Sequence, residues 1–299
     1  MIPAMRLCLV VNPNAGRKKG HEVAQRVGGL LSSAGHLVEE MVSVAPGGIR
    51  EVAETITPAD WDGIVAVGGD GTLFELVNGL LARNPSVPVP IGQIPVGTGN
   101  SFLKDFSIET VEDAVACVTS GRTRRVDLGH CTHASGAYHF VNLLGAGFVS
   151  NVAARARRYK WLGSASYVRG VLEEVARLRA TRMRLTVDGT TYEREGIFVE
   201  VCNSRFTGGN MMMAPGASVD DGLLDVIVAN RMSRRTLLRL LPTIFSGKHV
   251  DSPFVEVFRG RHVDLRTESP MALTPDGEII GSTPIETRIL PGALEMFGS

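Results

Sequence analysis

The chain has little that would tie it to nucleic acid, to the membrane interior or to an oxidising compartment. Lysine plus arginine number 31, as do aspartate plus glutamate, so no net charge attracts polyanions. No apolar run approaches the roughly 20 residues of a membrane-spanning helix. The cysteines lie far apart, which favours reduced thiols over disulfides: Cys8, Cys117, Cys131 and Cys202. We expect a cytoplasmic protein without a nucleic-acid partner.

Internal repeats, low-complexity tracts and long linkers are also missing. With 299 residues, 44% of them hydrophobic, the chain has the length of two ordinary globular domains. In residues 1–124, apolar runs such as "RLCLVV" and "GIVAVGG" alternate with amphipathic helical patterns such as "LFELVNGLLAR". This alternation predicts an α/β domain, a parallel sheet with helices on both faces, and residues 290–299 are a candidate for completing it.

The rhythm changes after about residue 124. Segments such as "RMRLTVDGTTYEREGIFVEVCN" read as strands, and Asp188-Gly189 is a strong hairpin signal. Helical patterns interrupt them around 150–180 and 233–246. Residues 125–289 are therefore predicted to form a β-rich, mainly antiparallel, sandwich-like domain. Ligands of α/β sheets bind beyond the carboxyl ends of the strands and often between domains, so we expect the site there.

Three glycine-rich turns follow predicted strands of the first domain: "VVNPNAGRK", "VAVGGDGT" and "IPVGTGNSF". One such turn indicates only a positive φ angle, but three at one sheet edge indicate a polyphosphate site, because glycine lets backbone N–H groups approach an anion. Thr72 and Ser101 are expected to begin helices whose positive ends face that anion. Neutral donors and cations lie nearby: Asn12, Thr72, Thr98, Arg17, Lys18 and Lys19.

Asp70 is unexpected inside the second turn, because a carboxylate repels phosphate unless a cation or ordered donors intervene. We interpret it as facing Mg²⁺, the waters of that ion or an acceptor hydroxyl. The structural alternative is that it caps backbone amides of its own turn. The three turns match neither the GxxxxGK[ST] phosphate loop nor the GxGxxG dinucleotide pattern.

The blocks "NPNAG", "GGDGT" and "IPVGTGNSF" resemble the nucleotide-binding motifs of the diacylglycerol kinase catalytic family, which includes soluble bacterial lipid kinases and the sphingosine and ceramide kinases. The resemblance continues through "VNLLGAGF", "PGASVDDGLLDV" and "TPDGEIIG", so it spans nearly the whole chain. NAD kinases share the GGDGT turn and a related fold, but the other blocks resemble the lipid kinases.

The resemblance implies an ATP site in the first domain. The chain departs from the family pattern at Phe74, where a polar residue is usual, and at Ser43, where threonine is usual. Serine keeps the hydroxyl group. The implied nucleotide contacts are Asn12, Ser43, Gly68, Gly69, Asp70, Gly71, Thr72, Leu73, Phe74 and Thr98.

A second acidic turn, "TPDGEIIG", lies at residues 274–281. Taken alone, Asp276-Gly277 indicates a hairpin and Glu278 a surface strand residue. The resemblance instead assigns Glu278 as the general base that accepts the proton of a lipid hydroxyl. Asp276 and Asp70 are the competing candidates.

A third group of acids lies in "ASVDDGLLDV". Acids in a turn are ordinarily solvated and structural, but the resemblance implies that Asp221 binds Mg²⁺ together with the carbonyl groups of Ser218 and Leu223. One carboxylate with carbonyls suits Mg²⁺, which retains several waters. A second Mg²⁺ is expected with the nucleotide phosphates.

Other segments are less specific. "ARARRYKWLGSASYVRG" and "RMSRRTLLRLLPTIFSGKH" combine basic residues with apolar faces, as interfacial helices do, and packing on the β domain is the alternative. Met211-Met212-Met213 fits a lipid-facing surface or the core. The histidines and cysteine of "HCTHASGAYH" lack zinc-site spacing and lie where two strands would turn.

Together these features predict an ATP- and Mg²⁺-dependent lipid kinase that converts diacylglycerol to phosphatidic acid. Kinases of sphingoid base, ceramide or phosphatidylglycerol are the enzyme alternatives, because the motifs do not encode the acceptor. A catalytically silent lipid- or nucleotide-binding protein is the alternative from another class, and the intact Asp70, Asp221 and Glu278 argue against it. The expected partners are a membrane lipid and, by peripheral association, the membrane surface; a homodimer is kept open.

Overall fold

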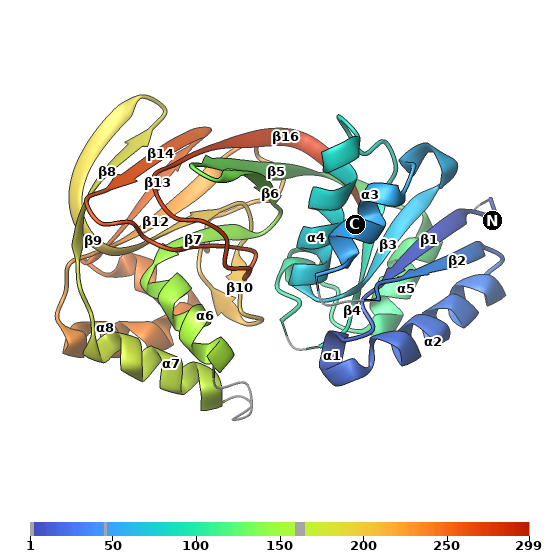
Figure 1. Cartoon of the computed structure of the whole chain (residues 1–299), viewed down its shortest axis with the longest axis horizontal. Coiled ribbons are helices and arrows are strands. Elements are labelled where there is room, and N and C mark those ends of the chain that lie inside the picture. Colours follow the sequence, from blue (N-terminus) through green and yellow to red (C-terminus); the bar gives the residue numbers. More distant parts are fainter. Residues whose placement is uncertain (1–2, 45–46, 98, 159–164, 299) are drawn as a thin grey trace. The chain divides into compact units, whose positions relative to one another are not determined.

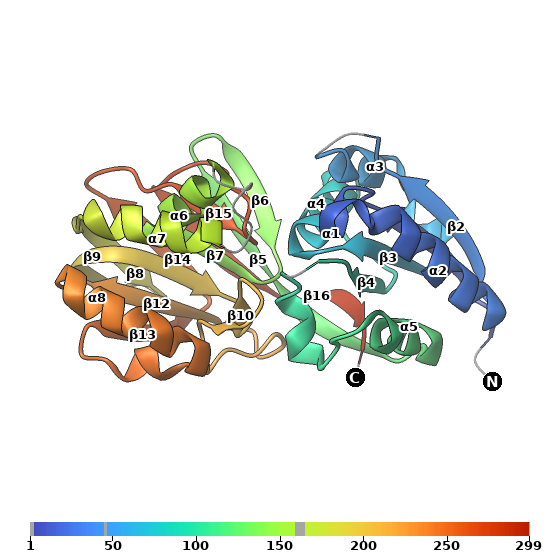
Figure 2. The ribbon, with the colours of Figure 1, turned by 90° about the horizontal axis from the view of Figure 1, so that it is seen from below.

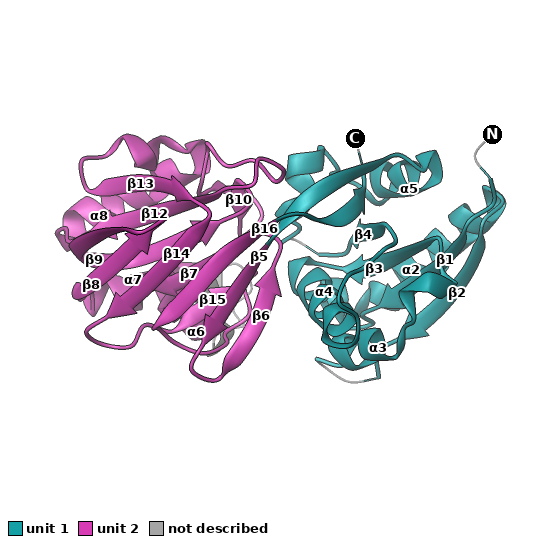
Figure 3. Cartoon of the chain, turned by 90° about the horizontal axis from the view of Figure 1, so that it is seen from above, with its two compact units in different colours: residues 1–128, 291–299 teal, residues 129–290 magenta. Residues whose placement is uncertain are grey.

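The computed structural model describes residues 3–44, 47–97, 99–158 and 165–298, and the chain divides into two compact units (Figure 3). Unit 1 comprises residues 1–128 and 291–299, and unit 2 comprises residues 129–290. These limits lie within two strands, β5 (Thr123–His133) and β16 (Ile285–Phe297), each of which has residues in both units. The predicted boundaries, 124/125 and 289/290, lie four residues and one residue earlier along the chain.

Unit 1 is a parallel sheet between two layers of helices (Figure 1). The strands run in the order β4-β3-β1-β2, and the last residues of β16 join in parallel at the β4 edge. Helices α3 and α4 pack together on one face, and α2 and α5 pack together on the other. Every residue of β3 is buried, as expected of a strand covered on both faces. The elements are β1 Arg6–Val11, α1 Ala15–Lys18, α2 Gly20–Ser33, β2 Leu37–Val42, α3 Ile49–Thr55, β3 Gly63–Gly68, α4 Asp70–Arg83, β4 Ile91–Pro95 and α5 Val111–Ser120.

The helix ends follow local sequence, with two differences from expectation. Thr110 forms a capping box with Asp113 at the start of α5, and Gly121 ends the helix in the left-handed conformation that glycine favours. Helix α4 begins at Asp70 rather than at Thr72, because Gly69 already has the extended conformation of an N-cap. Ser101 precedes only a short 3₁₀ helix, Phe102–Phe106.

Unit 2 is β-rich and mainly antiparallel. The long strand β9 pairs with β8 along its first half, with β7 along its second half and with β12 on its other edge. Asp188-Gly189 forms the turn between β8 and β9 with both φ angles positive, as the hairpin signal predicted. The predicted fold class, an α/β domain followed by a β-rich domain, is confirmed. The remaining strands are β6 Gly136–Phe140, β7 Leu143–Gly147, β8 Thr181–Val187, β9 Thr190–Cys202, β10 Phe206–Thr207, β11 Met211–Met212, β12 Leu224–Asn230, β13 Val255–Gly260, β14 His262–Thr267 and β15 Leu273–Pro275.

Three helices of unit 2 cover one face of this sheet (Figure 2). They are α6 (Phe148–Arg158), α7 (Ala165–Ala176) and α8 (Arg234–Leu240), and they confirm the helical patterns near 150–180 and 233–246. Part of the predicted interfacial segment 154–170 lies outside the described residues. No helix among the described residues is both long and apolar enough to cross a membrane.

Candidate active site

The three glycine turns of unit 1 lie together at the carboxyl ends of the strands, because the strands that precede them, β1, β3 and β4, are parallel neighbours. Backbone hydrogen bonds extend the ladder into the turns. The Asn12 N–H donates to the Val67 carbonyl over 3.2 Å, and the Val96 N–H donates to the Gly68 carbonyl over 3.3 Å. The first residues after β1 and β4, Asn12 and Val96, are therefore held beside the last residues of β3.

Side chains and close packing join the turns further. The Asn12 Nδ2 atom donates a hydrogen bond to Thr72 Oγ1 over 3.1 Å, which connects the first turn to the second. A Cβ atom at Gly16 would lie 2.8 Å from the Val96 side chain, so the first turn packs closely on the third. A Cβ atom at Gly68 would lie 2.1 Å from Thr72 Oγ1, so that position accepts only glycine.

Asp70 connects the second turn to the third. Its carboxylate accepts the backbone N–H of Ser101 over 2.9 Å and that of Phe102 over 3.4 Å. Burial of the carboxyl group raises the pKa of Asp70, and these hydrogen bonds partly offset the increase. The carboxylate therefore caps backbone amides, as in the structural alternative, but the amides belong to the third turn rather than to its own.

The other residues implied to contact the nucleotide differ in position and burial. Ser43 follows β2, is 2% exposed and donates its N–H to the Val11 carbonyl. Leu73 and Phe74 are buried in α4, which explains why an apolar residue is tolerated where the family pattern is polar. Gly71 lies in the first turn of α4. Thr98 lies outside the described residues.

The first turn also supplies cations. Arg17 and Lys18 are exposed and adopt positive φ angles of 62° and 70°, which is rare for residues with a Cβ atom. Backbone strain of this kind is common at ligand sites.

In unit 2, Asp276 anchors the acidic turn. It is 6% exposed, and its carboxylate accepts three backbone N–H groups, those of Val141, Asn142 and Leu143, at 2.9, 2.9 and 3.0 Å. Both of its oxygens are therefore engaged in holding the start of β7. The sequence does not reveal this role, because the partners lie more than 130 residues away.

Glu278 lies two residues farther along the same turn and is partly exposed. Its N–H donates to the Pro275 carbonyl over 2.7 Å, which closes the turn. Gly277, between the two acids, is exposed and has a φ angle of +87°. In this turn the Asp276 carboxylate is therefore buried and bound by backbone amides, whereas Glu278 is partly exposed to solvent.

An apolar cavity of about 510 Å³ opens in unit 2 next to this turn. Sequence patterns do not reveal this cavity, because its described lining residues come from six separate segments. The wall includes Gly277 and Thr274 of the turn region, and Glu200 is the one ionisable residue among the described lining residues. Four apolar residues of its lining are exposed: Val168, Leu172, Leu238 and Phe245. Its apolar lining residues include Phe148, Val171, Phe198, Met211, Met213 and Ile244.

The methionines and the second predicted interfacial segment contribute to this cavity. Met213 is a core residue at 2% exposure, which agrees with the core interpretation. Met211 is partly exposed, and both methionines line the cavity. In the segment 231–249, Leu237 is buried in the core while Leu238 is exposed.

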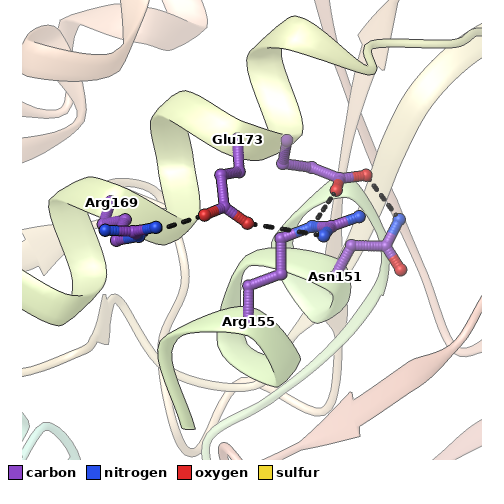
Figure 4. A network of polar contacts seen from close by, with 5 residues as sticks. Asn151, Arg155, Arg169 and Glu173 are labelled. Atoms are coloured by element: carbon purple, nitrogen blue, oxygen red, sulfur yellow. Dashed lines mark hydrogen bonds and ion pairs between the residues drawn. The ribbon is translucent and has the colours of Figure 1, made fainter. Parts of the chain in front are cut away.

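A polar network joins the two helices that form one cavity wall (Figure 4). Arg155 of α6 contacts Glu174 of α7 over 2.6 Å and Glu173 over 3.7 Å. Asn151 Nδ2 donates to Glu174 over 2.8 Å, and Arg169 Nε lies 3.1 Å from Glu173. Because Arg155 and Glu174 are mostly buried, this network holds α6 against α7 more firmly than surface ion pairs do.

The proposed metal turn contains an ion pair that the sequence did not indicate. Asp221 Oδ1 accepts the Leu223 N–H over 3.0 Å, and its Oδ2 pairs with the Arg259 guanidinium, which also contacts Asp225 over 3.2 Å. The Ser218 hydroxyl donates to Asp220 over 2.8 Å. No group of three histidine, cysteine, aspartate or glutamate residues able to hold a metal occurs within the described ranges.

The histidine-rich segment forms the β5–β6 hairpin, as expected. His130 and His139 are paired across the hairpin with ring centroids 4.9 Å apart. Burial lowers the pKa of His139 to about 4, so this ring is neutral near pH 7.

Comparison with known proteins follows the division into two units. Residues 6–131 match the diacylglycerol kinase catalytic domain, and residues 142–298 match the YegS C-terminal NAD kinase beta sandwich-like domain. A diacylglycerol kinase of Mycobacterium tuberculosis strain H37Rv is 31% identical over 297 residues, covering 98% of this chain and 94% of that protein. One of Bacillus subtilis strain 168 is 27% identical, covering 94% and 92%. Sphingosine kinase 1 of Arabidopsis thaliana is 26% identical, covering 92% and 68%.

Solved structures show the same fold. A crystal structure of a diacylglycerol kinase from Bacillus anthracis strain Sterne covers 100% of this chain and 98% of its own, with a TM-score of 0.75 at 20% identity. Another Bacillus anthracis structure matches with a TM-score of 0.83 at 24% identity.

Proposed function

Since this chain belongs to the diacylglycerol kinase catalytic-domain family, we propose that it transfers the γ-phosphoryl group of ATP to the free hydroxyl group of diacylglycerol, giving phosphatidic acid. It is a lipid kinase, and ATP is the phosphoryl donor. The observation that supports an acyl lipid as acceptor is the apolar cavity of about 510 Å³, whose wall includes Gly277 of the acidic turn. Cavities of this size and character bind small apolar ligands.

The ATP polyphosphate is assigned to the glycine turns of unit 1. The amino end of α4 supplies backbone N–H groups and the positive end of a helix dipole, and both attract phosphate. Asn12 and Thr72 hold the first two turns together. Asp70 acts as a positioning residue, because its carboxylate fixes the third turn through the amides of Ser101 and Phe102.

Glu278 is the proposed general base. Both oxygens of Asp276 are engaged by backbone amides, and the carboxylate of Asp70 also accepts two. Glu278 lies on the accessible side of its turn, next to the cavity residue Gly277. In this role its carboxylate accepts the proton of the lipid hydroxyl as the new P–O bond forms.

Mg²⁺ is proposed with the ATP phosphates, where it neutralises their charge, and at Asp221 with the carbonyl groups of Ser218 and Leu223. This donor set fits an ion that retains several waters, because it contributes one carboxylate and main-chain oxygens. Arg259 already pairs with the Asp221 carboxylate, so the guanidinium has to share or release it.

The acceptor is proposed to enter the cavity from a bilayer surface. The exposed apolar residues Val168, Leu172, Leu238 and Phe245 line the cavity. Exposed arginines on the same helices, Arg169, Arg235 and Arg239, suit contact with anionic headgroups. This combination supports peripheral and reversible association.

The test is phosphate transfer from γ-labelled ATP with Mg²⁺ into mixed micelles. The panel contains diacylglycerol, monoacylglycerol, phosphatidylglycerol, sphingosine and ceramide, with NAD as a soluble acceptor. We expect label in diacylglycerol, and a loss on the order of 10²–10⁴-fold in Glu278→Gln. Glu268→Gln, an exposed carboxyl of the same unit, is the matched control and should keep full activity.

Label in another lipid alone would correct the acceptor while leaving the kinase assignment in place. Absence of label from every lipid, with ATP binding intact, would support the catalytically silent binding protein instead. Full activity in Glu278→Gln would remove that residue from the base role.

A further inference from the structure

The cavity of unit 2 contains one acidic group for which the proposed reaction has no use. Glu200 is 2% exposed, lines the cavity and comes from the central strand β9. Its Oε2 atom is buried and has no hydrogen-bond partner. A buried polar atom without a partner is costly, so its presence on an otherwise apolar wall calls for a ligand group that pairs with it.

The strand pairing explains where this carboxyl group points. Phe198 and Glu200 are two residues apart on β9, so their side chains point to the same face of the strand, and both line the cavity. Gly145 lies directly opposite Glu200 on β7. Because Gly145 has no side chain, the Glu200 carboxyl and the Thr274 hydroxyl approach the same small space, 3.0 and 2.9 Å from where a Cβ atom would be.

The neighbouring hydroxyl groups do not serve as donors toward the cavity. Ser150 and Thr274 hydroxyls lie 2.7 Å apart, and both are within hydrogen-bond reach of the Gly145 carbonyl, at 3.1 and 3.4 Å. One hydroxyl donates to the other, and the second donates to the Gly145 carbonyl, so both hydroxyl hydrogens are used within this corner in either arrangement. Glu200 is thus the side chain of this corner whose hydrogen-bonding capacity is left for a ligand.

The burial of Glu200 also fixes its protonation state. Desolvation raises its pKa to about 8, so the group is mostly a neutral carboxylic acid at pH 7. A neutral acid can donate a hydrogen bond to a carbonyl oxygen, which a carboxylate cannot do.

We propose that the Glu200 carboxyl donates a hydrogen bond to the ester carbonyl oxygen of the acyl lipid whose chain occupies the cavity. This inference rests on the proposed lipid kinase function and refines its acceptor class. Glu200 then selects lipids that have a carbonyl group at the head of the chain over ether lipids and sphingoid bases, which lack one.

The test compares 1,2-didecanoylglycerol with 1,2-di-O-decylglycerol, which has the same free hydroxyl and chain length but no ester carbonyl. We expect the wild-type protein to favour the ester by about tenfold or more in kcat/KM, since a site built for a hydrogen bond rejects the analogue that lacks it. Glu200→Leu should bring the ratio close to one, mainly through a higher KM for the ester.

Two further variants separate recognition from packing. Glu200→Gln keeps a neutral donor of the same shape and should preserve most of the ester preference. Met213→Leu, which changes an apolar lining residue, should alter both lipids alike and leave the ratio unchanged.

An ester-to-ether ratio near one in the wild-type protein would overturn the inference without requiring any variant to fold. So would an unchanged ratio in Glu200→Leu. If neither glycerolipid were phosphorylated, the proposed function would fail, and equilibrium binding of the same two lipids in detergent would then decide this inference. Loss of the ester preference in binding by Glu200→Leu would support it, and an equal preference would overturn it.

Discussion

Gly145 on β7 lies opposite Glu200 on β9, and a methyl group at Gly145 would come within 3.0 Å of Glu200 Oε2. Gly145→Ala should therefore destabilise the protein by about 1–3 kcal/mol and raise the KM for lipid, while ATP binding stays unchanged. Gly29→Ala is the control, because a Cβ atom there meets nothing within 4 Å in helix α2. Thermal unfolding and steady-state kinetics measure both effects. A lipid KM that does not change would show that this corner does not contact the acceptor.

Asp276 and Glu278 should respond differently to the same chemical change. Asp276→Asn replaces an acceptor oxygen with an NH₂ group facing backbone N–H groups, so we expect a loss of about 2–3 kcal/mol of stability. Glu278→Gln should leave the melting temperature near that of the wild type and lower kcat. Calorimetry and steady-state kinetics together distinguish the structural role of Asp276 from the proposed catalytic role of Glu278. An Asp276→Asn variant that is as stable as the wild type but inactive would instead indicate that Asp276 is the base.

Stability should fall with rising pH because of Glu200. The folded chain holds this proton with a pKa of about 8, whereas the unfolded chain releases it near 4.5. The contribution is complete below pH 4.5, is lost as the pH rises toward 8, and is constant above that. Glu200→Gln removes this loss, so its melting temperature relative to the wild type should increase between pH 5 and pH 8.

Cys202, on the same strand, is the titratable group that the Glu200 charge influences; burial, Glu200 and Asp225 raise its pKa well above its ordinary value, so this thiol stays protonated between pH 5 and pH 8 in both proteins. Asp225 on β12 influences the same thiol and is present in both proteins. A difference in melting temperature that stays constant across this range would show that the Glu200 carboxyl titrates normally.

Binding of Mg²⁺ at the Asp221 turn should require the Asp221 carboxylate. We expect millimolar Mg²⁺ to raise the melting temperature of the wild-type protein, because an ion that binds the folded chain stabilises it by mass action. Asp221→Asn should abolish this shift, whereas Asp220→Asn, the adjacent acid, should retain it. A shift that persists in Asp221→Asn would place the ion elsewhere.

Much of the nucleotide half could be predicted from local sequence. Parallel strands end at one edge, so three glycine turns after three buried runs had to lie together. The caps of α5 are encoded by Thr110 and Gly121 themselves. Asp70 was harder to interpret, because its partners Ser101 and Phe102 lie in a different turn.

The surroundings of the cavity and of the Asp221 turn in unit 2 depend on contacts between distant residues, which local sequence patterns do not predict. The acid in "IFVEVC" interrupts an apolar strand, but only the burial of Glu200 and the absence of a side chain at Gly145 reveal its surroundings. The Asp221–Arg259 pair likewise joins residues that are distant in sequence. Local periodicity predicts elements, whereas pairing across strands decides which side chains meet.

The course of β16 has a consequence for how the protein is made. Its last residues pair with β4, and Leu294, Met296 and Phe297 are buried in unit 1. During translation, unit 1 therefore lacks this strand until unit 2 and the last residues of β16 have been synthesised. Until then β4 is an unpaired edge, open to association with other strands. A fragment ending at residue 128 would keep β4 as an exposed edge strand, so the sheet of unit 1 is completed only by residues that follow unit 2 in the sequence.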